Sequence, residues 1–254
     1  MLEKIIRSLL SQKEILIMTH TVIGYPDLNT SYQVIEAMVE NGSDLIELQI
    51  PFSEPIADGP LIEEANQRAL AQGITVANCF EFAQKVVSSF PIPFLFMSYY
   101  NILFCYGVKR FAEDLAQIGL AGALVPDLPI EEGKDYLMAM KQAGLDPILF
   151  FAPSTPLPRM KAIAQKASGF IYCVARKGVT GQNTAFDQAL AAYLARARQA
   201  TELPLALGFG IKNRADIAFL KGKAEIAVIG SELLRLTVNG GPKAVAQKLK
   251  ELRS

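Results

Sequence analysis

The chain has very little of several residue types on which common active sites depend. Its 254 residues contain no tryptophan and a single histidine, His20. One histidine excludes a histidine-rich zinc centre, so we expect no bound metal and carboxylates as the proton carriers. The three cysteines, Cys79, Cys105 and Cys173, are dispersed and odd in number. Such a set is typical of a reducing cytoplasm, and no two of them have the spacing of metal ligands.

The chain also lacks a net charge and long apolar runs. The 25 basic and 25 acidic side chains cancel, and no cluster of Lys and Arg supplies the positive surface that nucleic acids require. No apolar run reaches the ~18 residues of a membrane span. The first eight residues carry Glu3 within a short amphipathic pattern and do not resemble a signal peptide. We therefore expect a cytoplasmic protein with neither nucleic acid nor membrane as a partner.

A pattern of one short apolar run followed by one amphipathic segment repeats about eight times. The runs are Ile15–Met18, Leu45–Leu48, Phe94–Met97, Ala123–Val125, Ile148–Phe151, Phe170–Val174, Leu205–Leu207 and Ile226–Ile229. Segments of helical period lie between them, and examples are Ser31–Glu40, Asn78–Ser88, Val108–Ile118, Glu131–Gln142, Leu157–Lys166, Asp187–Gln199 and Lys212–Leu220. A last such segment, Pro242–Leu252, ends the pattern.

Continuous apolar strands separated by helices indicate parallel strands that are buried on both faces. Eight such units in about 250 residues are typical of a (β/α)8 TIM barrel. We expect one α/β domain over residues 1–254, with additional short helices. A doubly wound open sheet is the alternative, but no Gly-x-Gly-x-x-Gly follows the first run.

The junction between the second apolar run and the next loop carries two carboxylates. Glu47 lies within an apolar strand, and Asp58 follows in the turn sequence Ala-Asp-Gly-Pro. A buried carboxylate with a raised pKa beside a wetter one that stays ionised suits general acid–base chemistry. The alternative is that Glu47 pairs with a buried cation while Asp58 only shapes its turn.

The loops after the last three strands are rich in glycine. They are Arg176–Gln182, Gly208–Ile211 and Gly230–Leu233. Glycine lets backbone N–H groups approach an anion closely, and each loop leads into a helix N-terminus. Three such loops at the phosphate-binding corner of a barrel favour a phosphate site built from main-chain groups. Alternatively, each glycine only permits a tight turn.

These motifs together resemble the tryptophan synthase α subunit. Order and spacing match from Gly24 to Leu252, and the motifs that carry the resemblance are Glu47–Pro60, Asp127–Glu132, Arg176–Gln182, Gly208–Ile211 and Gly230–Ser231. The first motif is nearly diagnostic of that family, whereas the glycine motifs also suit other phosphate-binding barrels. An aldolase barrel would need a strand-borne Schiff-base lysine, and none of the eight runs contains a lysine.

The resemblance implies an activity and a partner. The family cleaves indole-3-glycerol phosphate by a retro-aldol reaction into indole and glyceraldehyde 3-phosphate. It forms an α2β2 heterotetramer, in which indole passes to a β subunit for tryptophan biosynthesis. No cofactor is expected in this chain, because pyridoxal phosphate belongs to the β subunit.

The resemblance also implies roles for particular residues. Glu47 is the acid–base group, with a raised pKa, and Asp58 accepts from the indole N–H, with a pKa that is not raised. Positions that match the substrate and phosphate site of the family are Tyr172, Thr180, Gly181, Gly210, Gly230 and Ser231. Glu54 lies in the loop that communicates with the β subunit.

Several positions depart from the usual pattern of the family, among them Ala175, where relatives have serine. Gln49 occupies a position where relatives have glycine, and Glu54 one where they have aspartate. His20 replaces an apolar pocket residue, and Val22 replaces a residue with a hydroxyl group. Gln49 is expected to narrow the pocket or to redirect Glu47 through a hydrogen bond. The departures leave open an alternative function, a weak or inactive α-like subunit that mainly activates the β subunit allosterically. His20 is either a hydrogen-bonded structural residue or a functional one at the barrel mouth.

Overall fold

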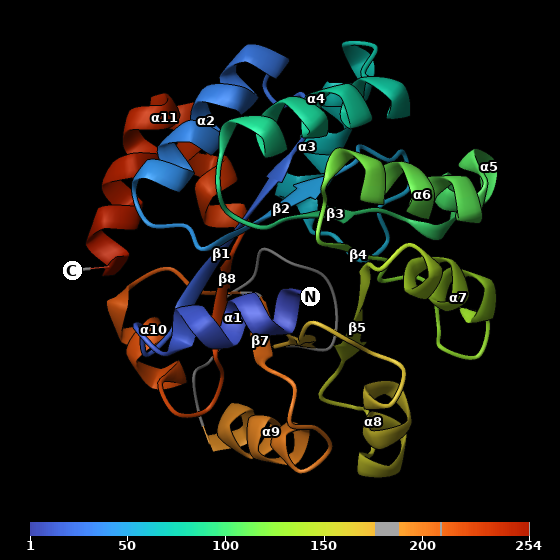
Figure 1. Cartoon of the computed structure of the whole chain (residues 1–254). Coiled ribbons are helices and arrows are strands. Elements are labelled where there is room, and N and C mark those ends of the chain that lie inside the picture. Colours follow the sequence, from blue (N-terminus) through green and yellow to red (C-terminus); the bar gives the residue numbers. More distant parts are fainter. Residues whose placement is uncertain (176–187, 209, 254) are drawn as a thin grey trace.

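Eight parallel strands form a closed barrel, as predicted from the sequence (Figure 1). The computed structural model describes residues 1–175, 188–208 and 210–253. Each strand pairs with the next along the chain, and β8 pairs with β1. The strands are β1 (Leu16–Val22), β2 (Leu45–Gln49), β3 (Phe94–Met97), β4 (Gly122–Leu124), β5 (Asp146–Phe151), β6 (Ile171–Val174), β7 (Leu205–Gly208) and β8 (Ile226–Ile229).

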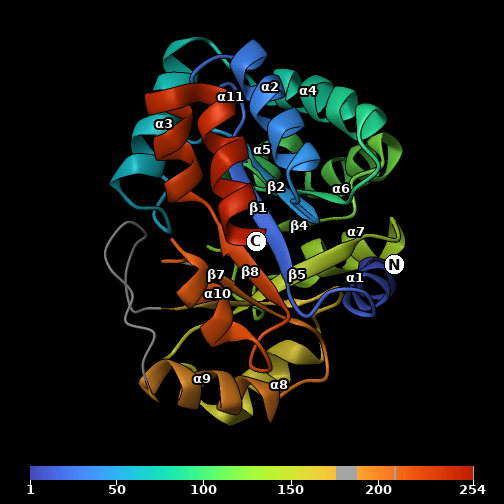
Figure 2. The same cartoon turned by 90° about the vertical axis from the view of Figure 1, so that its left-hand side faces the viewer.

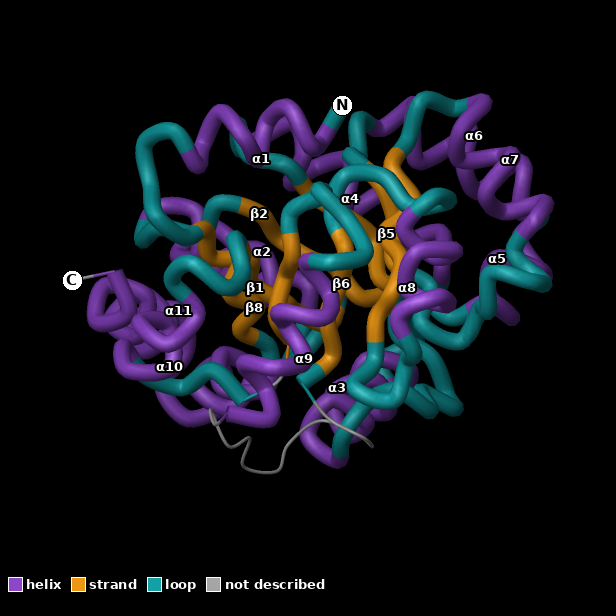
Figure 3. Tube along the Cα trace, turned by 90° about the horizontal axis from the view of Figure 1, so that it is seen from below, coloured by secondary structure: helices purple, strands orange, loops and turns teal. Residues whose placement is uncertain are grey.

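Helices surround the barrel, and the tube view from below shows them outside the strands (Figure 3). Those in the described part of the chain are α1 (Leu2–Leu10), α2 (Leu28–Glu40), α3 (Pro60–Ala71), α4 (Val76–Ser89), α5 (Tyr100–Tyr106), α6 (Val108–Ile118), α7 (Lys134–Gln142), α8 (Leu157–Ala164), α9 (Gln188–Arg198), α10 (Arg214–Leu220) and α11 (Ser231–Arg253). None of these helices has the length and apolar character that crossing a membrane requires.

Alternation along each strand divides the buried residues between two cores. On β1, Leu16 and Met18 join a cluster inside the barrel, whereas Ile17 packs in the larger cluster beneath the helices. Leu45 on β2 faces inward in the same way. Because side chains of a strand alternate with a period of two, the inward series continues to the carboxyl ends of these strands. It includes His20 on β1 and Glu47 on β2.

Two elements extend further than the apolar pattern predicted. β1 continues to Val22, since Thr19, His20 and Thr21 are buried and pair with β2 despite their polarity. Helix α11 begins at Ser231, directly after β8, and not only at Pro242. It is kinked at Gly241, whose φ of 64° lies in the left-handed region. Figure 2 shows α11 beside α2 and β1.

Helix α1 closes the end of the barrel at which the strands begin (Figure 1). Its buried side chains, Leu2 and Ile6, belong to the cluster inside the barrel. The backbone N–H of Leu2 donates to the Asp146 carboxylate at 2.8 Å, and Asp146 is the first residue of β5. This contact fixes α1 to the strand that it covers, so the opposite end of the barrel is the one available for a site.

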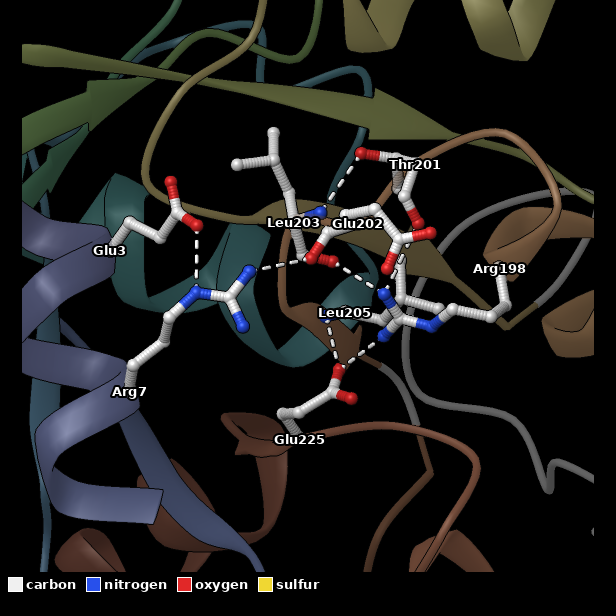
Figure 4. Close-up of polar contacts among 8 residues, drawn as sticks. All are labelled: Glu3, Arg7, Arg198, Thr201, Glu202, Leu203, Leu205 and Glu225. Atoms are coloured by element: carbon white, nitrogen blue, oxygen red, sulfur yellow. Dashed lines mark hydrogen bonds and ion pairs between the residues drawn. The ribbon is translucent and has the colours of Figure 1, made fainter. Parts of the chain in front are cut away.

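A polar network holds the chain where it enters β7 (Figure 4). Arg198 donates to the Glu225 carboxylate at 2.6 Å and to the Leu203 carbonyl at 2.9 Å. Glu225 also accepts the Leu205 N–H at 2.7 Å. Arg7 of α1 donates to the Glu202 carbonyl at 2.8 Å. The network ties α1, α9 and β7 together and sets the position of β7 in the barrel.

Gly122 offers a test of the strand packing. A Cβ atom at this position would collide with the Asp146 backbone carbonyl on β5. We expect Gly122→Ala to lower the free energy of unfolding by about 1–3 kcal/mol, the usual cost of overpacking. Gly133→Ala is the control, because its Cβ would meet no atom closer than 3.4 Å. Urea unfolding measures both, and an equal effect of the two variants would contradict the packing argument.

Candidate active site

Glu47 lies inside the barrel near the carboxyl end of β2. Its side chain is buried, with 4% of its surface exposed, and it lines the main cavity. Oε1 lies 3.3 Å from Nδ1 of His20, the residue beside it in register on β1. Oε2 has no hydrogen-bond partner among the described residues. The sequence offered two alternatives for Glu47, a pairing with a buried basic group and a place in an active site. Glu47 has both features, because it contacts His20 and also lines the cavity.

Asp58 is buried as deeply as Glu47, and this corrects the prediction that it is the wetter carboxylate. It is 4% exposed. Burial raises its pKa above the ordinary value for aspartate, and nearby His20 and the donors Gln49 and Tyr99 offset part of that rise. The prediction that the pKa of Asp58 is not raised was wrong. The turn sequence shows that the segment is polar, but it does not show which other residues cover it.

Two donors hold the Asp58 carboxylate. Gln49 Nε2 donates to Oδ2 at 2.7 Å, and the Tyr99 hydroxyl donates to the same oxygen at 2.9 Å. The Tyr99 oxygen also accepts the Ala57 N–H at 3.1 Å, so it bonds both to the carboxylate and to the backbone before it. Phe52 stacks on the Tyr99 ring with centroids 5.2 Å apart. These contacts attach the loop after β2 to the end of β3.

Gln49 acts differently from either expectation for it. Its amide donates to Asp58 and does not redirect Glu47. Gln49 is fully buried, and it is not among the residues that line the cavity. Its amide nitrogen is also 3.4 Å from Oδ1 of Asn66 on α3. The Gln49 amide thus donates a hydrogen bond to Asp58 and does not narrow the cavity.

A cavity of about 840 Å³ opens at the carboxyl ends of the strands. It brings together predicted residues from distant parts of the chain, namely Glu47, Asp58, Tyr172, Gly210, Gly230 and Ser231. Tyr172 is buried on β6, and its ring centroid lies 5.2 Å from that of Phe150. A Cβ atom at Gly208 would collide with the Tyr172 hydroxyl, so this glycine leaves room for the ring.

Part of the cavity wall has main-chain groups suited to an anion. Gly210 has a φ of 95°, a conformation that glycine adopts without strain. Gly230 directly follows β8, and Ser231 is the first residue of α11, so the N-terminal N–H groups of this helix lie at the wall. Lys212 and Arg235 also line the cavity. Thr180 and Gly181 lie outside the described residues.

Several residues of the site were not identified from the sequence. Asp127 lines the cavity and accepts the Tyr100 N–H through both carboxylate oxygens, at 2.9 and 3.1 Å. Burial raises the pKa of Asp127. Tyr99, which donates to Asp58, was given no role from the sequence either. Its position shortly after β3 was the available signal, since such positions in a barrel face the site.

Glu54 lies apart from the cavity. It is exposed on the loop between β2 and α3, and Ile56 two residues later is 72% exposed. The backbone N–H of Ile56 donates to the Glu54 carbonyl at 2.9 Å. The same short loop therefore carries a buried carboxylate at one end and an exposed charged and apolar surface at its tip. Among the described residues, no three His, Cys, Asp or Glu side chains are grouped to hold a metal ion.

Comparison with known proteins confirms the resemblance seen in the sequence. A family model described as tryptophan synthase alpha chain matches residues 6–254. The tryptophan synthase alpha chain of Syntrophotalea carbinolica is 60% identical over 253 residues, which cover 100% of both chains. That of Desulforapulum autotrophicum is 58% identical over 252 residues, 99% of this chain and 100% of the relative.

Solved structures agree with the sequence comparison. Tryptophan synthase of Mycobacterium tuberculosis superimposes with a TM-score of 0.93 at 31% identity, covering 99% of this chain and 96% of the other. A tryptophan synthase alpha subunit from Pyrococcus furiosus gives a TM-score of 0.86 at 30% identity, covering 94% and 97%. Both similarities extend over nearly the whole barrel.

The contacts of Tyr99 predict a specific loss in Tyr99→Phe. This change leaves the buried Asp58 with one donor fewer and the Ala57 N–H without its acceptor, so we expect unfolding to require about 1–3 kcal/mol less. Tyr106→Phe is the matched control, because its hydroxyl donates at 2.6 Å to Asp114 in a more exposed position. Urea unfolding distinguishes them, and a loss in Tyr106→Phe as large as that in Tyr99→Phe would argue against the loop attachment.

Proposed function

The chain belongs to the tryptophan synthase alpha chain family, and we propose that Glu47 and Asp58 perform the chemistry of that family here. The protein is a carbon–carbon lyase that cleaves indole-3-glycerol phosphate into indole and glyceraldehyde 3-phosphate for tryptophan biosynthesis. One observation supports the two roles above all others: both carboxylates line a single cavity that Gly210, Gly230 and Ser231 also line.

Glu47 is the acid–base group of this proposal. In the retro-aldol reaction the bond between indole C3 and the glycerol carbon breaks, the glycerol hydroxyl loses its proton, and C3 gains one. A single carboxylate that takes the first proton and supplies the second balances the reaction. Oε2 of Glu47, which no described residue bonds, is the oxygen that we assign to the substrate.

Asp58 acts on the indole ring. Protonation of C3 places positive charge on the ring, and a carboxylate that accepts the indole N–H stabilises this charge. The donors Gln49 and Tyr99 both end on Oδ2, so we assign Oδ1 to the indole nitrogen. Hydrogen bonds to the carboxylate favour its ionised form and work against the effect of burial.

The phosphate end of the substrate lies against Gly210, Gly230 and Ser231 in this proposal. The N-terminus of α11 supports it, because the partial positive charge of a helix N-terminus favours an anion. By resemblance, Thr180 and Gly181 complete the phosphate site from outside the described residues. Tyr172 packs beside the glycerol chain, since it lies on β6 and lines the same cavity.

The chain acts with a β subunit, as alpha chains of this family do, and it has no cofactor of its own. We place it in an α2β2 complex in the cytoplasm, with pyridoxal phosphate in the β subunit and residues 1–254 as one domain. Glu54 belongs to the contact with the partner. Its exposure next to Ile56, on the loop that carries Asp58, supports a link from partner to site.

The alternative function, an activator with weak or no cleavage, rested on Gln49, Glu54, His20 and Val22. The full-length relationship at 60% identity supports the enzyme and not this alternative. The geometry agrees, since Gln49 supports Asp58 and does not fill the cavity. No observation favours a second function for the chain.

Removal of either carboxylate should abolish most of the cleavage. We expect Glu47→Gln to lower kcat by about 10²–10⁴-fold, because an amide cannot exchange a proton. Asp58→Asn should lower it by about 10²–10³-fold through lost charge stabilisation. Glu64→Gln is the control on the exposed face of α3, where Glu64 pairs with Arg68. Release of indole from indole-3-glycerol phosphate, measured with saturating β subunit, reports the result; either carboxylate variant with full activity would refute its assigned role.

The position of Glu54 predicts a partner-specific defect. Glu54→Ala should leave the free energy of unfolding and cleavage by the isolated chain unchanged, since its side chain is exposed and outside the cavity. The acceleration of cleavage by added β subunit should fall several-fold. A titration of activity against β subunit, with Glu64→Gln alongside, measures this effect. Normal acceleration in Glu54→Ala would remove Glu54 from the interface.

A further inference from the structure

His20 is the one basic side chain buried inside the barrel beside Glu47 in the described part of the chain. It is 5% exposed, it lines the cavity, and its Nδ1 is 3.3 Å from Glu47 Oε1. The two residues are directly paired on neighbouring strands, so the contact is fixed by the register of β1 and β2. Gly230 packs against it from the end of β8, where an added Cβ would lie 3.4 Å from the His20 Cβ.

A second link leads from the same place to Asp58. Gln49 lies two residues after Glu47 and projects to the same side of β2. Its Nε2 donates to Asp58 at 2.7 Å. Its Oε1 and the Nε2 of His20 are both buried without a hydrogen bond that meets normal geometry. The Gln49 side chain lies close enough to His20 to raise its pKa by hydrogen bonding, and the two buried atoms satisfy each other when Nε2 of His20 carries a proton.

We propose that His20 is a positioning residue that is protonated on both ring nitrogens in the resting site, donates a hydrogen bond from Nδ1 to Glu47, and joins Glu47 to Asp58 through Gln49. The inference rests on the roles of Glu47 and Asp58 proposed above. It assigns to His20 and Gln49, two departures from the usual family pattern, a common task. The two carboxylates and the residues between them form one unit, which we call the carboxylate bridge (Glu47, His20, Gln49 and Asp58).

The charges of the site support a protonated imidazole. Burial by itself lowers the pKa of His20, but the charges of Glu47 and Asp58 and the Gln49 side chain outweigh it, and the net pKa is raised. Two carboxylates in one buried cavity repel each other, and an imidazolium between them relieves that repulsion. Other charged residues that line the cavity are Asp127, Arg159, Lys212, Glu232 and Arg235.

The bridge gives the two oxygens of Glu47 different tasks. Oε1 is held by His20, and Oε2 remains for the proton that passes between hydroxyl and C3. His20 keeps its own proton throughout, so it neither gains nor loses one in the reaction. Its positive charge stabilises Glu47 whenever Glu47 is ionised. The benefit is present below the raised pKa of His20 and is lost as the pH rises through it.

The lone histidine makes a direct test possible. In NMR of the intact chain labelled with ¹⁵N-histidine, every imidazole signal belongs to His20. We expect its pKa to lie above the ordinary value of about 6.5 and to fall by at least about one unit in Glu47→Gln. Gln49→Leu should lower it by less, and Glu64→Gln should leave it unchanged. A pKa at or below about 6.5, or one that is the same in Glu47→Gln, would overturn the proposal.

Kinetics test whether the proton matters for cleavage. The kcat/KM of the wild-type chain with saturating β subunit should decline at high pH with the pKa that NMR gives. His20→Asn keeps a side-chain N–H towards Glu47 but carries no positive charge and does not titrate, so we expect kcat to fall several-fold and the decline at high pH to disappear. His20→Phe, which removes the donor, should lower kcat about 10–100-fold with KM changed less than threefold, as expected for a misplaced catalytic group.

Two outcomes separate failure of this inference from failure of the proposed function. If His20→Asn and wild type share the same decline at high pH, the imidazole does not control it and the carboxylate bridge is refuted, while Glu47 and Asp58 keep their roles. If Glu47→Gln cleaves normally, the catalytic assignment fails, and the NMR titration still decides whether His20 is protonated. Should His20→Phe not fold, thermal melting reveals it, and His20→Asn with NMR still gives a result.

Discussion

The parallel register between β1 and β2 is the constraint on which the site depends. It places His20 beside Glu47 and directs both into the barrel above the apolar layers formed by Leu16, Met18 and Leu45. A shift by one residue would exchange every inward side chain for an outward one and move Glu47 beneath the helices. Closure of the barrel through β8 leaves no free edge at which such a shift could occur. The chemistry is therefore positioned by the same hydrogen bonds that close the barrel.

The site also buries two carboxylates inside the protein. Glu47 and Asp58 are nearly inaccessible to water, and burying a carboxylate without compensation is costly. Here the compensation comes from His20 for one and from Gln49 and Tyr99 for the other. In such surroundings each hydrogen bond and charge acts more strongly than in water, which is what a proton transfer and a developing ring charge require.

Much of the architecture follows from the sequence because it depends on periodicity. The eight apolar runs predicted the barrel, and the motifs that carry the family resemblance pointed to residues that line one cavity, such as Glu47, Asp58 and Gly230. The end of β1 was missed because Thr19 and Thr21 are polar yet buried. The burial of Asp58 was missed because Tyr99, which covers it, follows a different strand, β3. Gln49 was recognised as unusual, but its partner depends on side-chain direction, which no local pattern contains. Thr180 and Gly181 stay predictions, since they lie outside the described residues.

The residues that line the cavity come from different halves of the chain. The carboxylates belong to the segment that includes β2, whereas Gly210, Gly230 and Ser231 follow β7 and β8. A substrate that contacts both sets of residues therefore links the two halves of the barrel. Its binding free energy adds to the free energy of unfolding of the whole domain. Substrate binding and the stability of the closed barrel are therefore thermodynamically linked, and the bound ligand contributes to holding the fold together.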